Sequence, residues 1–240
     1  MLVDRARQVR EVRSRALGAG TDAQSPEPPK QLAFDESGFV RGSSTVDASG
    51  SGQKTGKVDL APKNMSPREK YDYYAKIVKD HGGTIDSAKP TVLGLRGLSV
   101  DGSHHTSKVT KKADETFVVL DPKTHTAKEL PGTTHPAQPI YNKRATGFLK
   151  PGNYETERHG NHNGDISWHV TTKDGNGTVP ATRDGKNSTM TAVLFHRPKG
   201  GQEVTSAGCQ VLKNGAAWES FKKGMPASGF HYTLVDANKG

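Results

Sequence analysis

The chain has 240 residues, of which 31% are hydrophobic, and it carries a formal net charge of +9 at neutral pH. This length suits one domain of ordinary size, with or without an appendage, and a mean hydropathy of -0.74 is low for a chain that is folded throughout. No run of about 18 consecutive apolar residues is present, which excludes a membrane-spanning helix. The single cysteine, Cys209, excludes an internal disulfide framework and a cysteine-rich zinc site.

The excess of positive charge indicates a polyanionic partner, such as nucleic acid, anionic lipid or bacterial cell wall. The basic residues are dispersed along the chain, and no nucleic-acid-binding motif accompanies them. We therefore expect no nucleic-acid partner.

The first part of the chain differs in composition from the rest. Residues 18–65 contain runs rich in glycine, serine and proline, which bury too little apolar surface to offset the entropy of ordering them. Residues 2–17 match a short basic helix with a narrow apolar stripe, and their charges leave no apolar core for a secretory signal. We predict a basic, disordered N-terminal segment and linker, 1–65, followed by a folded domain, 66–240.

Residues 66–81 have the pattern of a capped helix. Ser66 and Glu69 have the spacing of a capping box, and Pro67 occupies the first helical position. Gly82 and Gly83 follow as a C-terminal stop. The residues on the apolar face are Tyr71, Tyr74, Ile77 and Val78. We expect this face to pack against the domain rather than to bind a ligand.

Residues 90–235 consist mainly of short β-prone runs separated by turn signals. The expected strands are Thr91–Leu95, Thr116–Leu120, Thr146–Leu149, Asp165–Thr171, Thr178–Thr182, Met190–Phe195, Gln210–Leu212 and Phe230–Val235. A second helix is expected at 215–223, with Asn214 as its cap and Gly224 as its stop. Many short strands and few helices predict a mainly β fold, a sandwich or barrel with a few flanking helices.

The segment from Met190 to Leu212 is the most informative about chemistry. An apolar strand ends in His196, a loop follows, and Cys209 then precedes a second β-prone run. A nucleophilic thiol needs a base within hydrogen-bond reach, a backbone that presents it and donors for the oxyanion. The small residues before Cys209 allow a sharp turn, and a hairpin-like return would bring the thiol to His196. The pattern makes a Cys209–His196 dyad possible, although a lone cysteine is more often a buried structural thiol.

The same residues resemble the signature of the L,D-transpeptidase catalytic domain family. That signature is a histidine after an apolar strand, a loop, and Ser/Thr-x-Gly-Cys, which His196, Ser206, Gly208 and Cys209 match position by position. The resemblance is to a divergent, effector- or phage-like branch, since Ala207 stands where the family usually has a second histidine. It covers roughly 90–235 and implies an L,D-transpeptidase-like β fold.

The resemblance also implies the substrate and the reaction. Cys209 would attack a stem tetrapeptide of peptidoglycan, His196 would take its proton or pair with it as thiolate and imidazolium, and the backbone N–H groups of Gly208 and Cys209 would hold the oxyanion. Release of D-Ala would leave a thioester, which an amine or water would resolve. No metal and no cofactor is implied.

Further polar residues are candidates for substrate contact or support. Ser206 and Arg197 are candidate oxyanion or substrate residues, the latter through a bidentate contact with a carboxylate. His162 and His169 lie on or before a predicted strand that could line the cleft, and either one is a candidate for supporting the catalytic residues from a second layer. For histidines in loops, simple exposure is the commoner situation.

A wall enzyme acts in the periplasm or cell wall, yet the N-terminus has no visible export signal. A missing or clipped signal, a specialised secretion system or release by lysis would reconcile the two, and the last two suit an antibacterial effector or a phage-associated lytic protein. A producing cell would then need an immunity protein as a partner.

Other functions remain open at this stage. A non-catalytic cell-wall-binding β domain is the main alternative, because it also explains the charge. A papain-like dyad would use His231 after Cys209. A zinc hydrolase would use His159, His162 and His169, or His104 and His105, but no HExxH-like pattern accompanies them.

Overall fold

A computed structural model describes residues 56–106, 109, 111–137, 140–141, 144–199 and 206–239. The helix predicted at 2–17 and most of the linker predicted at 18–65 lie outside the described residues. Within them, no helix combines the length and the apolar character that crossing a membrane requires.

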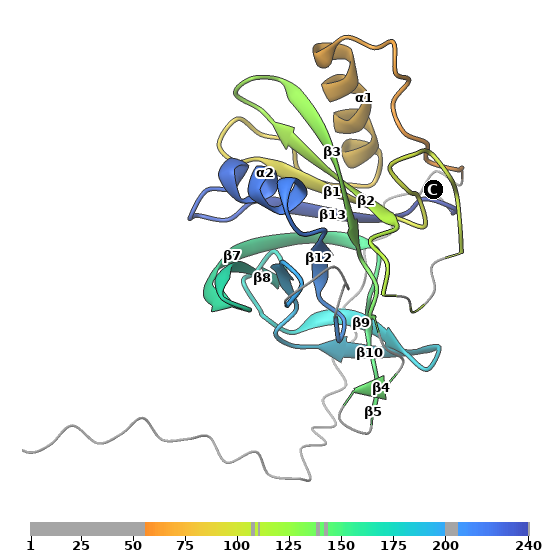
Figure 1. Ribbon diagram of the computed structural model, residues 1–240, viewed down its shortest axis with the longest axis vertical. Coiled ribbons are helices and arrows are strands. Elements are labelled where there is room, and N and C mark those ends of the chain that lie inside the picture. The colour runs from red at the N-terminus through yellow and green to blue at the C-terminus, as the bar shows by residue number, and fades with distance from the viewer. Residues whose placement is uncertain are drawn as a thin grey trace, which may run out of the picture. The chain divides into compact units, whose positions relative to one another are not determined.

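Eight strands close into a barrel, which confirms the predicted mainly β fold (Figure 1). Around the barrel they are β1 (Thr91–Arg96), β13 (His231–Asp236), β7 (Gly152–His162), β8 (Asp165–Thr171), β11 (Leu194–His196), β12 (Gln210–Leu212), β3 (Thr126–Thr133) and β2 (Glu115–Asp121). Most neighbouring pairs are antiparallel, but β1 and β13 are parallel, and so are β11 and β12. In the second parallel pair, β11 ends in His196 and β12 begins directly after Cys209.

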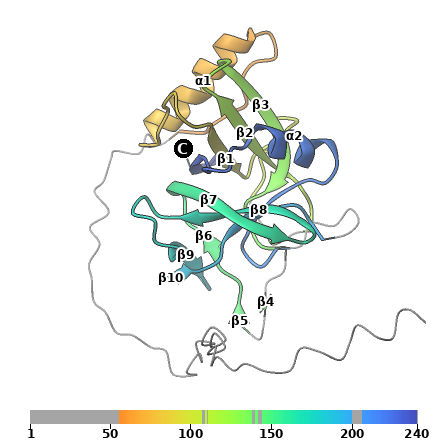
Figure 2. The same cartoon turned by 90° about the vertical axis from the view of Figure 1, so that its left-hand side faces the viewer.

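Two smaller sheets and two helices complete the described fold (Figure 2). A three-stranded sheet consists of β10 (Lys186–Met190), β9 (Val179–Arg183) and β6 (Phe148–Leu149), and a two-stranded sheet consists of β4 (Ile140–Tyr141) and β5 (Arg144–Ala145). The helix α2 (Ala216–Gly224) buries Trp218 and Phe221. Both side chains belong to the main core, which also contains Val179 and Ala181 of the three-stranded sheet.

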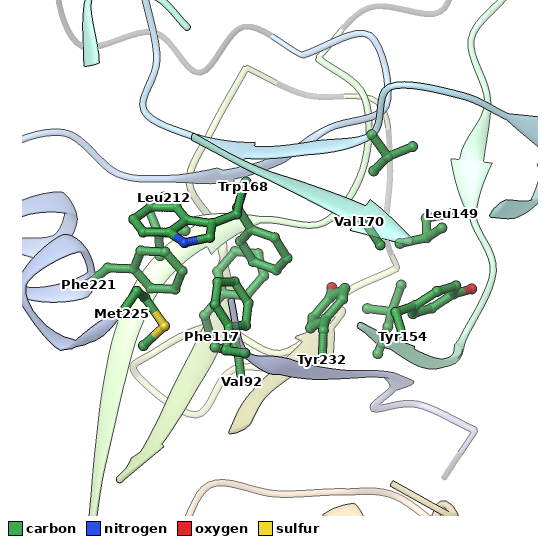
Figure 3. Packing of buried hydrophobic residues seen from close by; sticks show 14 of the residues in the cluster. Val92, Phe117, Leu149, Tyr154, Trp168, Val170, Leu212, Phe221, Met225 and Tyr232 are labelled. Carbon is green, nitrogen blue, oxygen red and sulfur yellow. The ribbon is translucent and has the colours of Figure 1, made fainter. Parts of the chain in front are cut away.

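Aromatic rings form the centre of this core (Figure 3). The ring of Phe195 on β11 stacks on Phe221 of α2, with centroids 5.7 Å apart, and meets Tyr232 of β13 edge-on at 4.7 Å. Trp168 of β8 contacts Phe221 in the same way at 5.6 Å. Offset and edge-to-face pairs of this kind stabilise a core beyond the area that they bury. This packing holds β11, the strand that ends in His196, against α2 and against β13, which is not its neighbour in the barrel.

The predicted first helix is present as α1 (Pro67–Asp80). The capping box is confirmed, since the Ser66 hydroxyl accepts from the Glu69 N–H and the Glu69 carboxylate accepts from the Ser66 N–H. Tyr74 is fully buried in a second apolar cluster, between α1 and residues of β1 and β2. Val58 and Ala61 join that cluster, so ordered packing begins N-terminal of the domain boundary expected at 65.

A buried ionic network lies inside the barrel. The carboxylate of Glu115, with no exposed surface, accepts hydrogen bonds from the Gly97 N–H at 2.9 Å and from the Thr134 hydroxyl at 2.7 Å, and lies 3.0 Å from Nδ1 of His135. Arg96 donates to Thr134 and to the Leu149 carbonyl. Burial alone would raise the pKa of Glu115, but the hydrogen bond and charge of His135, with the charge of Arg96, outweigh it and hold the pKa at about 2.

The predicted strands Asp165–Thr171 and Gln210–Leu212 match β8 and β12. The strand expected at Met190–Phe195 is wrong in its bounds, because β10 ends at Met190 and β11 begins only at Leu194. The expected helix cap at Asn214 is also wrong. The N-cap is Gly215, which caps with no side chain and has a φ of 76°. The strands β3 and β7 were not predicted, since polar residues and glycines obscure their alternation.

We predict that Glu115→Ala destabilises the protein by about 3–5 kcal/mol, because it leaves buried cationic and polar groups without their carboxylate. The matched control is Glu157→Ala, because the Glu157 side chain is 67% exposed and its ion pair with His169 is long, at 3.5 Å. Its cost should stay below about 1 kcal/mol. Urea unfolding measures both, and equal losses would contradict the prediction.

Candidate functional site

The parallel pairing of β11 and β12 brings the two predicted catalytic segments together. Phe195 pairs with Gln210 and His196 with Val211, so Cys209, which directly precedes β12, lies beside the strand that ends in His196. Paired residues and alternate residues share a face of a sheet. Cys209, Val211 and His196 therefore emerge on one face, opposite to the face on which Phe195 enters the core.

A short turn, held by Ser206, presents the thiol. The Ser206 hydroxyl accepts from the Gly208 N–H at 3.0 Å and donates to the Cys209 carbonyl at 2.9 Å. Gly208 has a φ of 120°, and a Cβ there would lie 2.8 Å from the Gly147 carbonyl oxygen and 3.0 Å from Sδ of Met190. Ser206 and Gly208 thus shape the turn. The Gly208 N–H, expected to hold the oxyanion, is already engaged by Ser206.

Cys209 is a protonated thiol at neutral pH. The residue is partly exposed, and burial around its sulfur raises the pKa of the thiol, against a smaller lowering by a backbone hydrogen bond from Leu194. Its Sγ lies 3.9 Å from the carbonyl oxygen of Ala192. Ala192 has a φ of 55°, in the left-handed region that costs energy for any residue with a side chain. A strained segment therefore lies against the sulfur.

His196 is held in one tautomer. The residue is 2% exposed, and its Nδ1 lies 2.6 Å from the carbonyl oxygen of Arg197. A carbonyl oxygen only accepts, so Nδ1 carries the proton and Nε2 has the lone pair. Burial lowers the pKa of His196 to about 4, and the nearby His162 adds to this shift. The imidazole is neutral at pH 7 and has the form that a general base requires.

The thiol and the imidazole are not hydrogen-bonded to each other. Among the hydrogen bonds of the described residues, none joins Sγ of Cys209 to a ring nitrogen of His196. The raised pKa of Cys209 and the lowered pKa of His196 both favour the neutral pair. The thiolate–imidazolium resting state, one of the two states considered from the sequence, is disfavoured.

The supporting candidates lie around His196 rather than around the sulfur. The ring of His162, at the end of β7, has its centroid 4.6 Å from that of His196, and burial lowers its pKa. His169 on β8 pairs with Leu194, and its Nδ1 lies 3.5 Å from the carboxylate of exposed Glu157. Arg197 donates from Nη2 to the Asn163 carbonyl at 3.0 Å and has its Nε 3.7 Å from Asp165. In this arrangement the guanidinium holds the β7–β8 turn.

The other histidines have different neighbours. His231 lies between the carboxylates of Glu155 and Asp86, at 2.6 and 2.8 Å, on a strand that is not adjacent to β12. His104 contacts Asp59 at 2.7 Å. Within the described ranges, no three or more His, Cys, Asp or Glu side chains are gathered in a way that could hold a metal ion.

Two groups beside the site, His135 and Asn163, are not among the residues predicted from the sequence. His135 continues the β3–β12 register, in which Thr133 pairs with Val211, and so falls opposite Cys209 in the backbone alignment. Asn163 contacts His196 from the turn between β7 and β8. The Asn163-Gly164 dipeptide is a strong signal for a two-residue hairpin turn, so the position of this turn could be predicted from the sequence. By contrast, no local sequence pattern indicates that His135 pairs with Glu115.

Comparisons with protein-family models, with curated proteins and with solved structures find no match to this chain. The resemblance to the L,D-transpeptidase family stays a prediction.

We predict that Gly208→Ala destabilises the protein by about 2–4 kcal/mol, because a β-carbon would meet the Gly147 backbone and adopt a disfavoured φ. Gly185→Ala is the matched control: its φ is 71°, but a Cβ there has open space. That variant should lose only about 1 kcal/mol. Urea unfolding compares the two, and a Gly208→Ala cost no greater than the control would contradict the steric argument.

We predict that iodoacetamide alkylates Cys209 slowly at pH 7, and that the rate rises with a midpoint above the ordinary thiol pKa of about 8.5. The control is the same chain unfolded in urea, where burial no longer acts on the thiol. Mass spectrometry over a pH series gives both midpoints. A folded-state midpoint below that of the unfolded chain would instead indicate a thiolate–imidazolium pair.

Proposed function

We propose that the protein is a cysteine-dependent enzyme that modifies peptidoglycan stem tetrapeptides, as an L,D-transpeptidase, an L,D-carboxypeptidase or both. The observation that carries this proposal is the parallel pairing of β11 with β12, which brings Cys209 beside the strand that ends in His196. Three further features support it: Cys209 is partly exposed as a residue, Ser206 closes the turn that precedes it, and the imidazole of His196 is neutral with a defined tautomer.

The proposed reaction begins with proton transfer from Cys209 to Nε2 of His196 as the sulfur attacks a peptide carbonyl. The carbonyl belongs to the diamino acid that precedes the terminal D-Ala. A bond forms between Sγ and the carbonyl carbon, the C–N bond to D-Ala breaks, and the imidazolium gives its proton to the leaving amine. An amine of a second stem, or water, then attacks the thioester and restores the thiol.

The resting state determines how this step has to proceed. Because thiol and imidazole are both neutral at rest, the proposed reaction includes transfer of the thiol proton to Nε2 of His196. The two side chains must also approach each other when substrate binds, since they are not hydrogen-bonded at rest. Catalytic hydrogen bonds often form only in the substrate complex.

A positive net charge supports the choice of substrate. At +9 the chain is attracted to the anionic polymers of a bacterial wall, and added salt weakens this attraction. The protein would then act in the periplasm or the cell wall. If it is delivered there as an antibacterial effector, an immunity protein is its expected partner in the producing cell.

A non-catalytic wall-binding domain is the second candidate. The observation that favours it is the resting thiol itself, whose pKa burial raises and which has no hydrogen bond to His196. A structural cysteine has these properties. The two candidates differ in whether any chemistry depends on Cys209.

We expect wild-type protein to remove terminal D-Ala from tetrapeptide stems, or to form direct cross-links between diamino acids. Purified sacculi and isolated tetrapeptides are incubated with protein, and the products are identified by mass spectrometry. Cys209→Ala should abolish the products, because it removes the atom that forms the thioester. His125→Gln, on the β2–β3 turn, is the matched control and should leave product formation unchanged.

Unchanged substrate with folded wild-type protein would reject the enzymatic proposal. Sacculus binding that Cys209→Ala leaves intact would then support the wall-binding domain.

A further inference from the structure

The turn between β7 and β8 reaches the end of β11. His162 pairs with Asp165 at the end of the hairpin, leaving Asn163 and Gly164 as its two turn residues. Their φ angles are 55° and 79°, both in the left-handed region. Asn-Gly is the preferred sequence for a two-residue turn of this kind. The turn conformation is thus dictated locally, and it directs the Asn163 side chain to His196.

Two contacts join Asn163 to the end of β11. Its Nδ2 donates to the Arg197 carbonyl oxygen at 3.3 Å and lies 3.4 Å from Nδ1 of His196. In return, Nη2 of Arg197 donates to the backbone carbonyl of Asn163 at 3.0 Å. Hairpin turn and strand end are therefore tied together in both directions.

We call the contacts between Asn163 and Arg197 the clamp. The Arg197 carbonyl connects this clamp to the imidazole of His196. It accepts the proton of Nδ1 of His196 at 2.6 Å, and it also accepts from the Asn163 amide. The Asn163 amide thus holds in place the carbonyl oxygen that accepts from the imidazole, and only the Nδ1–H tautomer of His196 can donate to that oxygen. Nε2 then has the lone pair that the proposed reaction uses.

We propose that Asn163 is a positioning residue for His196. It holds the Arg197 carbonyl oxygen in place, and that oxygen keeps the imidazole in the tautomer that can accept the Cys209 proton. This inference rests on the proposed function, in which His196 is the general base. Asn163 itself touches neither Sγ nor the substrate in this role. It acts through the Arg197 carbonyl oxygen, to which both its amide and Nδ1 of His196 donate.

The charged and titratable groups around the imidazole come from each neighbouring element. His162 of β7 lies against the ring, and Cys209 precedes the adjacent strand β12. Arg197 follows His196, and its Nε lies 3.7 Å from Asp165 at the start of β8. Lys222 of α2 also pairs with Asp165, at 3.2 Å. Asn163 is uncharged, so placing a carboxylate at this position changes the local charge directly.

The test compares Asn163→Gly, Asn163→Asp and wild type. Glycine accepts the turn conformation but removes the amide, so the fold is retained while the clamp is lost. The matched control is Asp184→Gly, because Asp184 and Gly185 form the corresponding turn between β9 and β10, with φ angles of 49° and 71°. Circular dichroism and thermal melting confirm that each variant is folded at the assay temperature.

Turnover of tetrapeptide stems is the first measurement. We expect Asn163→Gly to lower kcat about tenfold with KM within about twofold, equivalent to about 1.4 kcal/mol of transition-state stabilisation. Asp184→Gly should leave both constants unchanged. For Asn163→Asp, a carboxylate near Nδ1 stabilises the imidazolium, so the acid limb of the pH–kcat profile should move upward by about one pH unit or more. Wild-type kcat and an unmoved acid limb in both Asn163 variants would overturn the inference.

Nitrogen-15 NMR of the His196 ring is the second measurement and needs no substrate. Wild type and Asp184→Gly should show the Nδ1–H tautomer, and Asn163→Gly should show a mixture of tautomers. An unchanged tautomer in Asn163→Gly would overturn the inference. If wild type shows no turnover but Asn163→Gly still alters the tautomer, the proposed function fails while the positioning role stands.

Discussion

The buried carboxylate of Glu115 is the interaction on which the rest of the described fold depends. It lies inside the barrel with no exposed surface, and it joins the end of β1, the start of β2 and the chain that follows β3, through Gly97, Thr134 and His135. Arg96 extends the network to the Leu149 carbonyl on β6. A buried charge without such partners would cost several kcal/mol. These segments are therefore constrained together, and their geometry determines where the chain continues beyond β3.

That continuation leads directly to the candidate site. Beyond Thr133 the chain runs alongside the cysteine turn, and the Ala137 N–H donates to the Ser206 carbonyl at 2.8 Å. On the other side of β12, β11 is fixed by the aromatic packing of Phe195. The turn that presents Cys209 thus lies between two neighbours. One is the segment after β3, which the ion pair of Glu115 positions, and the other is β11, which apolar packing positions. Together these two neighbours decide where the sulfur and the imidazole lie.

Local signals made some of this predictable from the sequence. The capping box at Ser66 acts within one helical turn, and the strands β8 and β12 are β-prone runs of their own. The turn at Gly208 was expected from its small residues, and its left-handed φ explains why glycine is needed. By contrast, β7 is a strand mainly because β13 and β8 pair with it along its length. The Glu115–His135 pair and the contact of Asn163 with His196 join residues 20 or more positions apart, so no local pattern revealed them.

The protonated state of the one cysteine also has a consequence for the oxidation of its sulfur. Peroxide and disulfide compounds attack the thiolate, and a neutral thiol reacts with them slowly. Burial keeps Cys209 in the neutral form and surrounds its sulfur with protein. The same burial thereby protects the sulfur from oxidation to sulfenic acid and from mixed disulfides. In an oxidising solution the folded protein should therefore keep its thiol intact for longer than the unfolded chain does.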